Sequence, residues 1–394
     1  MSGPLILHLA GSALTGLLVT ALISRRIRRH ASALDLLDRP VATRKTHDRA
    51  MPTGGGLAIA AGVVAGAAVL YGLRGTLPMM TTHLSFWAGG LVILTTGLWD
   101  DRRGVGFKTK FALQIVAAYL LLHTGTFFDV GRFSFVGGSE FNQALYSIPL
   151  SMIWVVGIIN AVNLIDGMDG LATGVAAIAF AACAALFGVK GHLELMGLGV
   201  VAAGALAGFL PYNFKPASLF MGDSGSLFLG YLLAAYTLQA PLHPEPLLAF
   251  LMLPVLLGVP VLDTGAAIVR RWRSPHSLFG PDRGHLHHQL VKNGSETRAV
   301  MVLYTAAASF GGTAVLMGTL PTPWGYGLLG GTGALAVGGA WALGCLAPTA
   351  RRRAPAEDGQ ETSGEAVTTN GREPGETDAP VPDRERAVPA RRGP

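Results

Sequence analysis

Charge is the property that this sequence lacks most clearly. Only 14% of its 394 residues are Asp, Glu, Lys or Arg, whereas soluble domains carry about 25%. Half of the residues are hydrophobic, and the mean hydropathy is +0.44. So little charge argues against an ordinary soluble domain, because most of the molecular surface must be covered by something apolar.

Cysteine is also nearly absent. The two cysteines, Cys183 and Cys345, each lie inside an apolar stretch, and their spacing matches no metal-binding pattern. We therefore expect neither a disulfide framework nor a zinc–thiolate site, and we interpret both thiols as small buried side chains.

Long apolar runs take the place of charge. A membrane-spanning helix needs about 20 mostly apolar residues, and eleven ranges qualify: 3–23, 52–73, 84–99, 108–124, 145–161, 170–188, 192–210, 219–239, 246–269, 299–319 and 323–347. The predicted fold is an all-α polytopic membrane protein, with one membrane domain over residues 1–350. Residues 351–394, rich in Glu, Arg, Pro, Gly and Thr, are expected to form a disordered tail.

The basic residues predict how these helices are oriented. No basic residue precedes the first apolar range and "RRIRR" follows it, which favours an uncleaved helix with its N-terminus outside over a cleaved signal peptide. With that start, 22 of the 30 lysines and arginines fall in inner segments, 3 in outer loops and the others further along the tail. Cytoplasmic loops show this bias, so the C-terminus is predicted to be cytoplasmic. The net charge of +6 therefore requires no nucleic-acid partner.

Acidic residues gather on the same predicted face. Of the 24 acids, 20 lie on the inner side or in the tail, and a charge at the end of a span is costly unless it is paired or functional. In "GLWDDRRGVGFKTK", Asp100 and Asp101 end one span and Lys110 begins the next. Adjacent carboxylates favour a shared proton or cation, and lysines bind phosphate. A solvated loop that only sets orientation is the alternative for this stretch.

The stretch "NAVNLIDGMDG" holds a second group of oxygen ligands. Its members recur every three residues: Asn160, Asn163, Asp166 and Asp169. A continuous helix would point the last away from the first, whereas the two glycines are typical of a helix that stops and lets the chain fold back. The group then suits magnesium, sugar or phosphate. The alternative is that these residues only cap helix ends.

Two further acids stand at or below the predicted inner surface. In "FMGDSGSLFLG", Asp223 marks a helix N-terminus that accepts phosphate, or that is simply capped by Asp223 or its neighbouring serine. Asp263 lies about two turns inside a span, so we expect it to be paired or to face a polar cavity.

A basic patch follows in "RRWRSPHSLFGPDRGHLHHQL". Its members are Arg271, His285, His287 and His288. Arginine binds phosphate oxygens in a bidentate manner and histidine donates to them, so the patch suits a diphosphate or a nucleotide. Three histidines also allow a zinc site, but no cysteine or matching fourth ligand accompanies them.

These stretches resemble, in the same order, the motifs of the polyprenyl-phosphate N-acetylhexosamine-1-phosphate transferases. They are "RKTHDRAMPTGGGLAI", "GLWDDRRG", "NAVNLIDGMDGLATG", "FMGDSGS" and "RRWRSPHSLFGPDRGHLHHQL". The "HLHH" form is closer to the branch that makes lipid-linked N-acetylglucosamine for cell-wall polymers and O-antigen, since the peptidoglycan branch usually shows consecutive histidines. The chain departs from related sequences after Asp101, where Arg102 and Arg103 stand and a further acid is often found.

The resemblance implies a reaction. The phosphate of a polyprenyl (undecaprenyl or decaprenyl) phosphate attacks a UDP-N-acetylhexosamine, with N-acetylglucosamine the favoured sugar. The products are UMP and a polyprenyl-diphosphate-sugar, the first lipid-linked intermediate of a cell-envelope polymer. The resemblance also implies Mg²⁺, or Mn²⁺ in its place, and a site on the cytoplasmic face of the plasma membrane. It leaves a homodimer open.

Residue roles follow from the same resemblance. Asp223 is expected to be the first metal ligand, with Asn163 beside it. The expected catalytic carboxylates are Asp100, as base or orienter of the lipid phosphate, with Asp101, Asp166 and Asp169. The expected substrate-binding residues are Lys45, Lys110, Asn160, Asp263, Arg271, His285, His287 and His288. Whether an aspartate forms a covalent intermediate stays open.

Two other classes of protein share some of these features. A secondary transporter also has buried acids and broken, Gly-rich helices, but its site lies near the membrane midplane and it is built from repeats, which this sequence lacks. A membrane prenyltransferase also binds magnesium through aspartates. It would show two similar aspartate motifs, whereas the motifs here differ and a histidine cluster is added.

Overall fold

The computed structural model describes residues 3–38, 50–74, 84–123, 125–128, 140–239, 242–273, 284–292 and 294–346. The compact unit formed by Met1–Thr349 contains all of them. Lys45 and the predicted tail lie outside the described residues.

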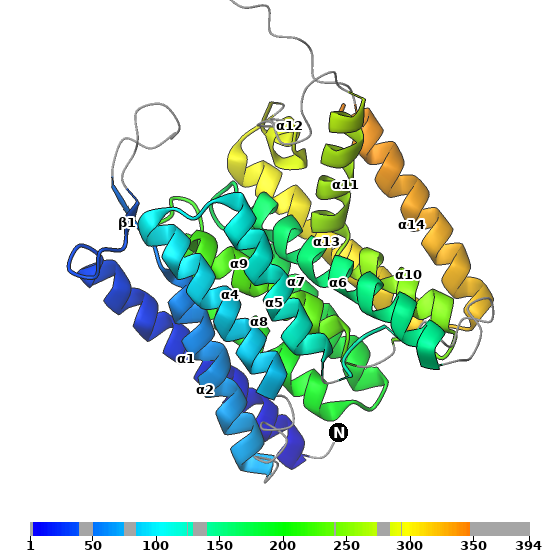
Figure 1. Cartoon of the computed structure of the whole chain (residues 1–394), viewed down its shortest axis with the longest axis horizontal. Coiled ribbons are helices and arrows are strands. Elements are labelled where there is room, and N and C mark those ends of the chain that lie inside the picture. The colour runs from blue at the N-terminus through cyan, green and yellow to red at the C-terminus, as the bar shows by residue number, and fades with distance from the viewer. Residues whose placement is uncertain are drawn as a thin grey trace, which may run out of the picture. The chain divides into compact units, whose positions relative to one another are not determined.

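Helices make up most of the described residues (Figure 1). In chain order they are α1 (Gly3–His30), α2 (Gly55–Arg74), α4 (Leu84–Arg103), α5 (Phe107–Leu122), α6 (Glu140–Ile165), α7 (Leu171–Val189), α8 (Leu193–Asn213), α9 (Gly222–Thr237), α10 (Pro246–Leu256), α11 (Gly258–Trp272), α12 (Leu286–Lys292), α13 (Glu296–Thr319) and α14 (Thr322–Ala342). Two short strands, β1 (Leu37–Asp38) and β2 (Met51–Pro52), pair antiparallel between α1 and α2.

Each of the eleven predicted spans falls on one of these helices, and 246–269 falls on the pair α10 and α11. Six described helices are long and apolar enough to cross a membrane, or up to seven if that bent pair is one span. Helices α5 and α9 have 16 residues each, fewer than the roughly 20 that span a bilayer without help. The fold is that of an all-α membrane protein. The count of eleven spans and the outside N-terminus stay predictions.

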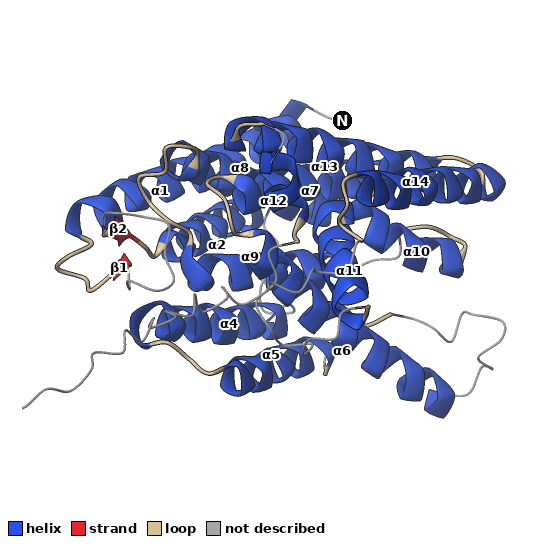
Figure 2. Ribbon diagram, turned by 90° about the horizontal axis from the view of Figure 1, so that it is seen from above, coloured by secondary structure: helices blue, strands red, loops and turns tan. Residues whose placement is uncertain are grey.

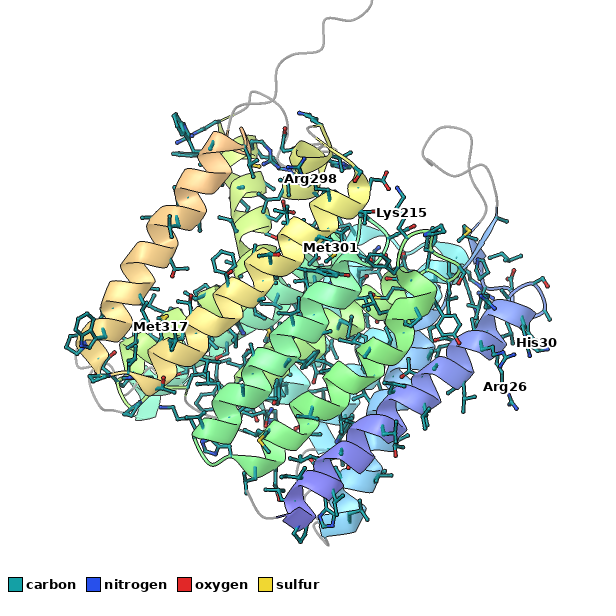
Figure 3. All side chains as sticks on the ribbon, turned by 180° about the vertical axis from the view of Figure 1, so that it is seen from behind. Arg26, His30, Lys215, Arg298, Met301 and Met317 are labelled. Carbon is teal, nitrogen blue, oxygen red and sulfur yellow. The ribbon has the colours of Figure 1, made fainter. Side chains whose placement is uncertain are left out.

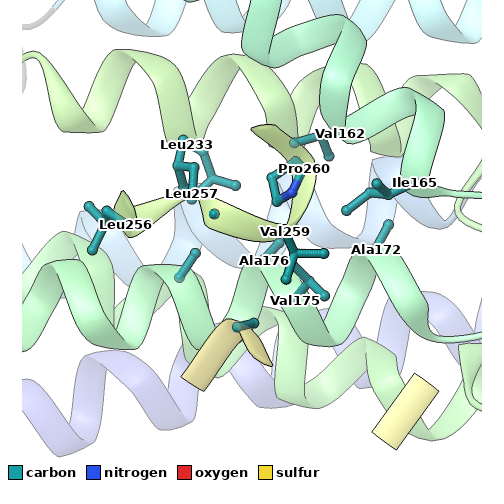
Figure 4. Close-up of a pocket in the computed structure, with 13 residues that line it drawn as sticks. Val162, Ile165, Ala172, Val175, Ala176, Leu233, Leu256, Leu257, Val259 and Pro260 are labelled. Carbon is teal, nitrogen blue, oxygen red and sulfur yellow. The ribbon is translucent and has the colours of Figure 1, made fainter. Parts of the chain in front are cut away.

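The break between α10 and α11 bends the chain by 84°. Pro260 lies in the first turn of α11, where its missing N–H costs no intrahelical bond. Side chains from α6 and α7 fill the inside of the bend, and the space that remains is about 10 Å³ with an almost entirely apolar lining (Figure 4). Val162, Val175 and Leu257 are among the residues that enclose it. A cavity this small and apolar holds no polar substrate.

Helix α9 is the central element of the bundle. Every residue from Ser224 to Thr237 is buried. Figure 2 shows α4, α5 and α6 in a row on one side of α9, and α1, α8, α7 and α13 in a row on the other. Glycines let two neighbours approach its first turn closely: a Cβ at Gly97 of α4 would lie 2.3 Å from the Ser224 Cα, and one at Gly56 of α2 would lie 2.4 Å from the Gly225 backbone nitrogen. The N-terminus of α9 is therefore held between α2 and α4.

Candidate active site

Five aspartates from distant parts of the sequence line one cavity of about 810 Å³. They are Asp100, Asp101, Asp166, Asp169 and Asp223. They stand at the C-terminal end of α4, in the turn between α6 and α7, and in the first turn of α9. Because these three places meet at the same end of the bundle, the fold concentrates negative charge there.

Lys110, in the first turn of α5, joins two of these aspartates. Its Nζ lies 2.8 Å from Asp100 Oδ2 and 2.8 Å from Asp223 Oδ2. All three side chains are partly buried, at 14% to 30% exposure. The ammonium group of Lys110 therefore lies between the two carboxylates. The negative charge of these carboxylates would also favour the binding of a metal cation.

The donor atoms around this point fit Mg²⁺. Asn163 Nδ2 lies 3.3 Å from Asp223 Oδ1 and 2.8 Å from Ser226 Oγ, so its amide stands beside the expected first ligand. Among the described residues, no three His, Cys, Asp or Glu side chains are arranged to enclose a metal. Magnesium commonly keeps several waters and binds through one or two carboxylates together with substrate phosphates, so Asp223 with Asn163 beside it suffices for it. The described residues therefore contain no cluster of three such side chains that could form the alternative zinc site.

Asp101 has a different position from Asp100. Its Oδ1 accepts a hydrogen bond of 2.7 Å from the backbone N–H of Asp223, and its Oδ2 accepts one of 3.1 Å from that of Ser224. Gly222, at φ +73°, permits this approach, because a Cβ there would lie 2.6 Å from Asp101 Oδ2. The sequence predicted that this helix N-terminus accepts phosphate, or is capped by Asp223 or Ser224. In the structure, the backbone N–H groups of this helix end donate to the carboxylate of Asp101 instead.

Asp166 and Asp169 lie in the turn that separates α6 from α7. The backbone changes direction at Gly170, which has φ +78°. Asp169 Oδ2 accepts a hydrogen bond of 3.0 Å from the Ala217 backbone, which ties the turn to the loop after α8. Burial, together with the charges of Asp223, Asp101 and Asp169, raises the pKa of Asp166 to about 7. A cation in the cavity would favour the charged form of Asp166.

The histidine helix α12 closes the cavity from another side. His288 lines the cavity, and its ring centroid is 4.2 Å from that of His287. His287 is buried against the α6–α7 turn, since a Cβ at Gly167 would lie 2.9 Å from its Nε2. Burial and the neighbouring charge of His288 lower the pKa of His287 to about 4, so its imidazole is neutral at pH 7.

Asp263 holds this helix in place. Its Oδ2 lies 2.7 Å from His285 Nδ1, and its Oδ1 accepts a hydrogen bond of 2.6 Å from the Leu286 backbone. The sequence expectation that this buried acid is paired is confirmed. Asp263, His285 and Arg271 are not among the residues that line the cavity. Their roles in substrate binding stay predictions.

Comparisons with known proteins identify the family. Residues 83–240 match the model of glycosyl transferase family 4. The chain is 34% identical over 305 residues to a probable undecaprenyl-phosphate N-acetylglucosaminyl 1-phosphate transferase of Bacillus subtilis (strain 168), covering 77% of this chain and 83% of that protein. The chain belongs to glycosyl transferase family 4. The resemblance inferred from the motifs is thereby confirmed.

Two further family members have similarly named activities. A decaprenyl-phosphate N-acetylglucosaminephosphotransferase of Mycobacterium tuberculosis (strain ATCC 25618 / H37Rv) is 36% identical over 332 residues, with 75% of this chain and 79% of that protein covered. An undecaprenyl-phosphate alpha-N-acetylglucosaminyl 1-phosphate transferase of Escherichia coli (strain K12) is 28% identical over 306 residues, with 74% and 79% covered. The region that matches the family model runs from just before α4 to just after α9, and so contains the five cavity aspartates.

Some residues of this family 4 cavity were not predicted from the sequence. Lys215 and Glu296 line it and form an ion pair with each other. Asn213 also lines it, and its amide accepts a hydrogen bond of 2.6 Å from Thr173 Oγ1 and donates one of 3.2 Å to the Leu219 carbonyl. Asn213 and Lys215 belong to "PYNFKPASLFMGD", directly before Asp223, where two polar side chains between apolar spans were the available signal.

Two further residues that were predicted to bind substrate are not among those that line the cavity. Lys45 lies outside the described residues. Asn160 is described but does not line the cavity, and its amide contacts Gln114 of α5 instead.

Proposed function

We propose that this protein transfers N-acetylglucosamine 1-phosphate from UDP-N-acetylglucosamine to a polyprenyl phosphate. The products are UMP and a polyprenyl-diphosphate-N-acetylglucosamine. The observation that carries the proposal is the meeting of five aspartates in one cavity at one end of an apolar helix bundle, with Lys110 paired to two of them. The names of the family members above support the choice of donor sugar and acceptor lipid.

Phosphoryl transfer depends on positioning and charge neutralisation more than on covalent chemistry by the protein. In the proposed reaction an oxygen of the acceptor phosphate forms a bond to the sugar-linked phosphorus of the donor. The bond from that phosphorus to the bridging oxygen breaks, and UMP leaves with the electron pair. Asp100 would orient the acceptor phosphate and accept a proton from it where the acceptor arrives as a monoanion.

Other residues would bind the diphosphate and neutralise its negative charge. Mg²⁺, when bound, would neutralise the diphosphate, and Asp223 with Asn163 would hold it. Lys110, held beside Asp100 and Asp223, would also contact a phosphate oxygen. His288, on the opposite wall, would donate to the diphosphate, and Asp101 keeps the first turn of α9 in position for Asp223.

The proposed orientation places the cavity on the cytoplasmic side. Figure 3 shows Arg26, His30, Lys215 and Arg298 at one end of the bundle and Met317 at the other. Basic residues accumulate on the cytoplasmic side of membrane proteins, and nucleotide sugars are soluble, charged molecules that reach the site from water. The bent pair α10–α11, the element that best suits a transporter, encloses only a small apolar cavity.

The experiment is a transfer assay on the purified protein in detergent. Undecaprenyl phosphate and Mg²⁺ are mixed with UDP-N-acetylglucosamine, or with other UDP-N-acetylhexosamines, and UMP is followed. We expect UMP release that requires the lipid, stops with EDTA and is fastest with UDP-N-acetylglucosamine. Folded protein that releases no UMP with any donor, at several acceptor chain lengths, would contradict the proposal.

A further inference from the structure

Two helices at the edge of the cavity carry polar side chains one turn apart. On α5, Gln114 follows Lys110 by four residues, and on α6, Asn163 follows Asn160 by three. Such spacing puts each pair on one face of its helix. Lys110 and Asn163 both contact Asp223. Gln114 lies one turn after Lys110 and Asn160 one turn before Asn163, and neither lines the cavity.

Gln114 and Asn160 form a reciprocal amide pair. Asn160 Nδ2 donates to Gln114 Oε1 at 2.7 Å, and Gln114 Nε2 donates to Asn160 Oδ1 at 3.5 Å. Asn160 Nδ2 also donates to the Val156 carbonyl at 2.7 Å. Gln114 is only 2% exposed. A buried amide left without partners would be costly, so the pair strongly favours one register of α5 against α6.

The other contacts of helix α5 that bear on its position are mainly apolar. It packs against α4 and α6, while its outer face, with Phe111, Val116 and Tyr119, is exposed. Apolar packing of this kind tolerates small rotations and shifts of a helix, whereas a reciprocal amide pair does not. One residue of rotation turns a helix by about 100°, which would carry Lys110 away from both carboxylates.

We infer that Gln114 and Asn160 are a positioning pair that fixes Lys110 between Asp100 and Asp223. Asn160 is thereby assigned to the placement of α5 and not to substrate binding, which was the expectation from the sequence. The inference rests on the proposed function, since it concerns the same site. It adds Gln114, a residue outside the acidic motifs, to the set on which turnover depends.

The test replaces each amide by an apolar side chain of similar size, in Gln114→Leu and Asn160→Leu. With Lys110 misplaced, kcat should fall by about tenfold or more, while the KM for UDP-N-acetylglucosamine stays within about twofold. The double variant Gln114→Asn with Asn160→Gln exchanges the lengths of the two side chains and should restore much of kcat, while Gln114→Asn alone should not.

Thr237→Val is the matched control. It removes the hydrogen bond of 3.1 Å from Trp154 Nε1 to Thr237 Oγ1, which joins α6 to α9 away from the cavity. We expect it to lower the thermal midpoint without changing kcat. If Gln114→Leu and Asn160→Leu behave like Thr237→Val, the pair only adds stability and the inference is wrong. If Asn160→Leu raises only the KM for the nucleotide sugar, Asn160 contacts substrate and the inference is also wrong.

A second readout does not depend on turnover. The Nζ of Lys110, held between two carboxylates, should react slowly with an amine-directed reagent, as followed by mass spectrometry of the labelled protein. Labelling should become several-fold faster in Gln114→Leu and stay unchanged in Thr237→Val. If labelling is unchanged in Gln114→Leu as well as in Thr237→Val, the inference is wrong. This outcome does not depend on UMP release, so it is distinguishable from failure of the proposed function.

Discussion

The carboxylate of Asp101 accepts a hydrogen bond of 2.7 Å from the backbone N–H of Asp223. One acid of the cavity therefore fixes the helix end that carries another. An anion at a helix N-terminus is stabilised by the unpaired N–H groups and by the helix dipole. The adjacent aspartates of α4 have distinct tasks as a result: Asp100 contacts Lys110, and Asp101 holds α9.

Asp101→Ala should therefore destabilise the protein as well as inactivate it. Loss of a helix cap costs about 1–2 kcal/mol, and the first turn of α9 would move together with Asp223. Unfolding midpoints in detergent, measured beside UMP release, check this. Asp100→Ala is the comparison, since it removes the contact with Lys110 and the hydrogen bond from the Val105 backbone but leaves the α9 cap; a midpoint of Asp101→Ala equal to that of the unsubstituted protein would contradict the capping role.

Asp223→Asn should abolish transfer and leave a folded protein. The substitution keeps the shape of the side chain and removes the charge that pairs with Lys110 and that would hold Mg²⁺. We expect kcat to fall by at least about 10²-fold, with an unchanged elution profile and thermal midpoint within a few degrees. Turnover near that of the unsubstituted protein at saturating Mg²⁺ would show that Asp223 is not the metal ligand.

Asp166 should make stability depend on pH. Its pKa is raised from 3.8 to about 7 by burial and by the neighbouring aspartates, so the native state binds this proton more tightly than the unfolded state does. The stabilisation from the protonated form is present below pH 4 and is lost as the pH rises through about 7. Thermal midpoints without Mg²⁺ should show Asp166→Asn gaining on the unsubstituted protein between about pH 5 and pH 8. A constant difference across that range would contradict the raised pKa.

His287→Ala should weaken the use of the nucleotide sugar. The buried imidazole fills the space between His288 and the α6–α7 turn, so its removal lets the cavity wall relax. We expect a higher KM for the UDP-sugar, and the same direction of change for Gly167→Ala, whose Cβ would press on the His287 ring from the other side. Unchanged kinetics in both variants would assign the ring a purely structural role in the loop.

Deletion of residues 354–394 should leave transfer intact. The sequence of this segment predicts a solvated chain without a packed core, and the deletion keeps the arginines at 351–353 that help to set orientation. Initial rates with lipid acceptor and UDP-sugar, normalised to folded protein, measure the effect. A large loss of transfer activity would show that this segment contributes to the reaction, which would contradict the prediction.

The helices were largely predictable because apolar run length is a local property. Each predicted range falls on a helix, although the ends differ: the range 145–161 was too short, since α6 continues to Ile165 and carries Asn163 in its last turn. The pairing of β1 with β2 was not predicted, because two residues per strand leave no alternation to detect. The bend between α10 and α11 was read as one span, since hydropathy does not register a change of direction.

By itself, the sequence determined which acidic residues gather at one end of the bundle, and it predicted the chemistry of the site. Hydropathy and charge order the segments along the membrane normal, which is enough to bring Asp100, Asp166 and Asp223 to one side. Only the tertiary structure decided which polar groups meet. In it, Asn160 contacts Gln114, Asp263 contacts His285, and Asp101 accepts hydrogen bonds from the N-terminus of α9. Side-chain direction depends on the rotation of each helix against its neighbours, and that rotation is set by contacts between residues far apart in the chain.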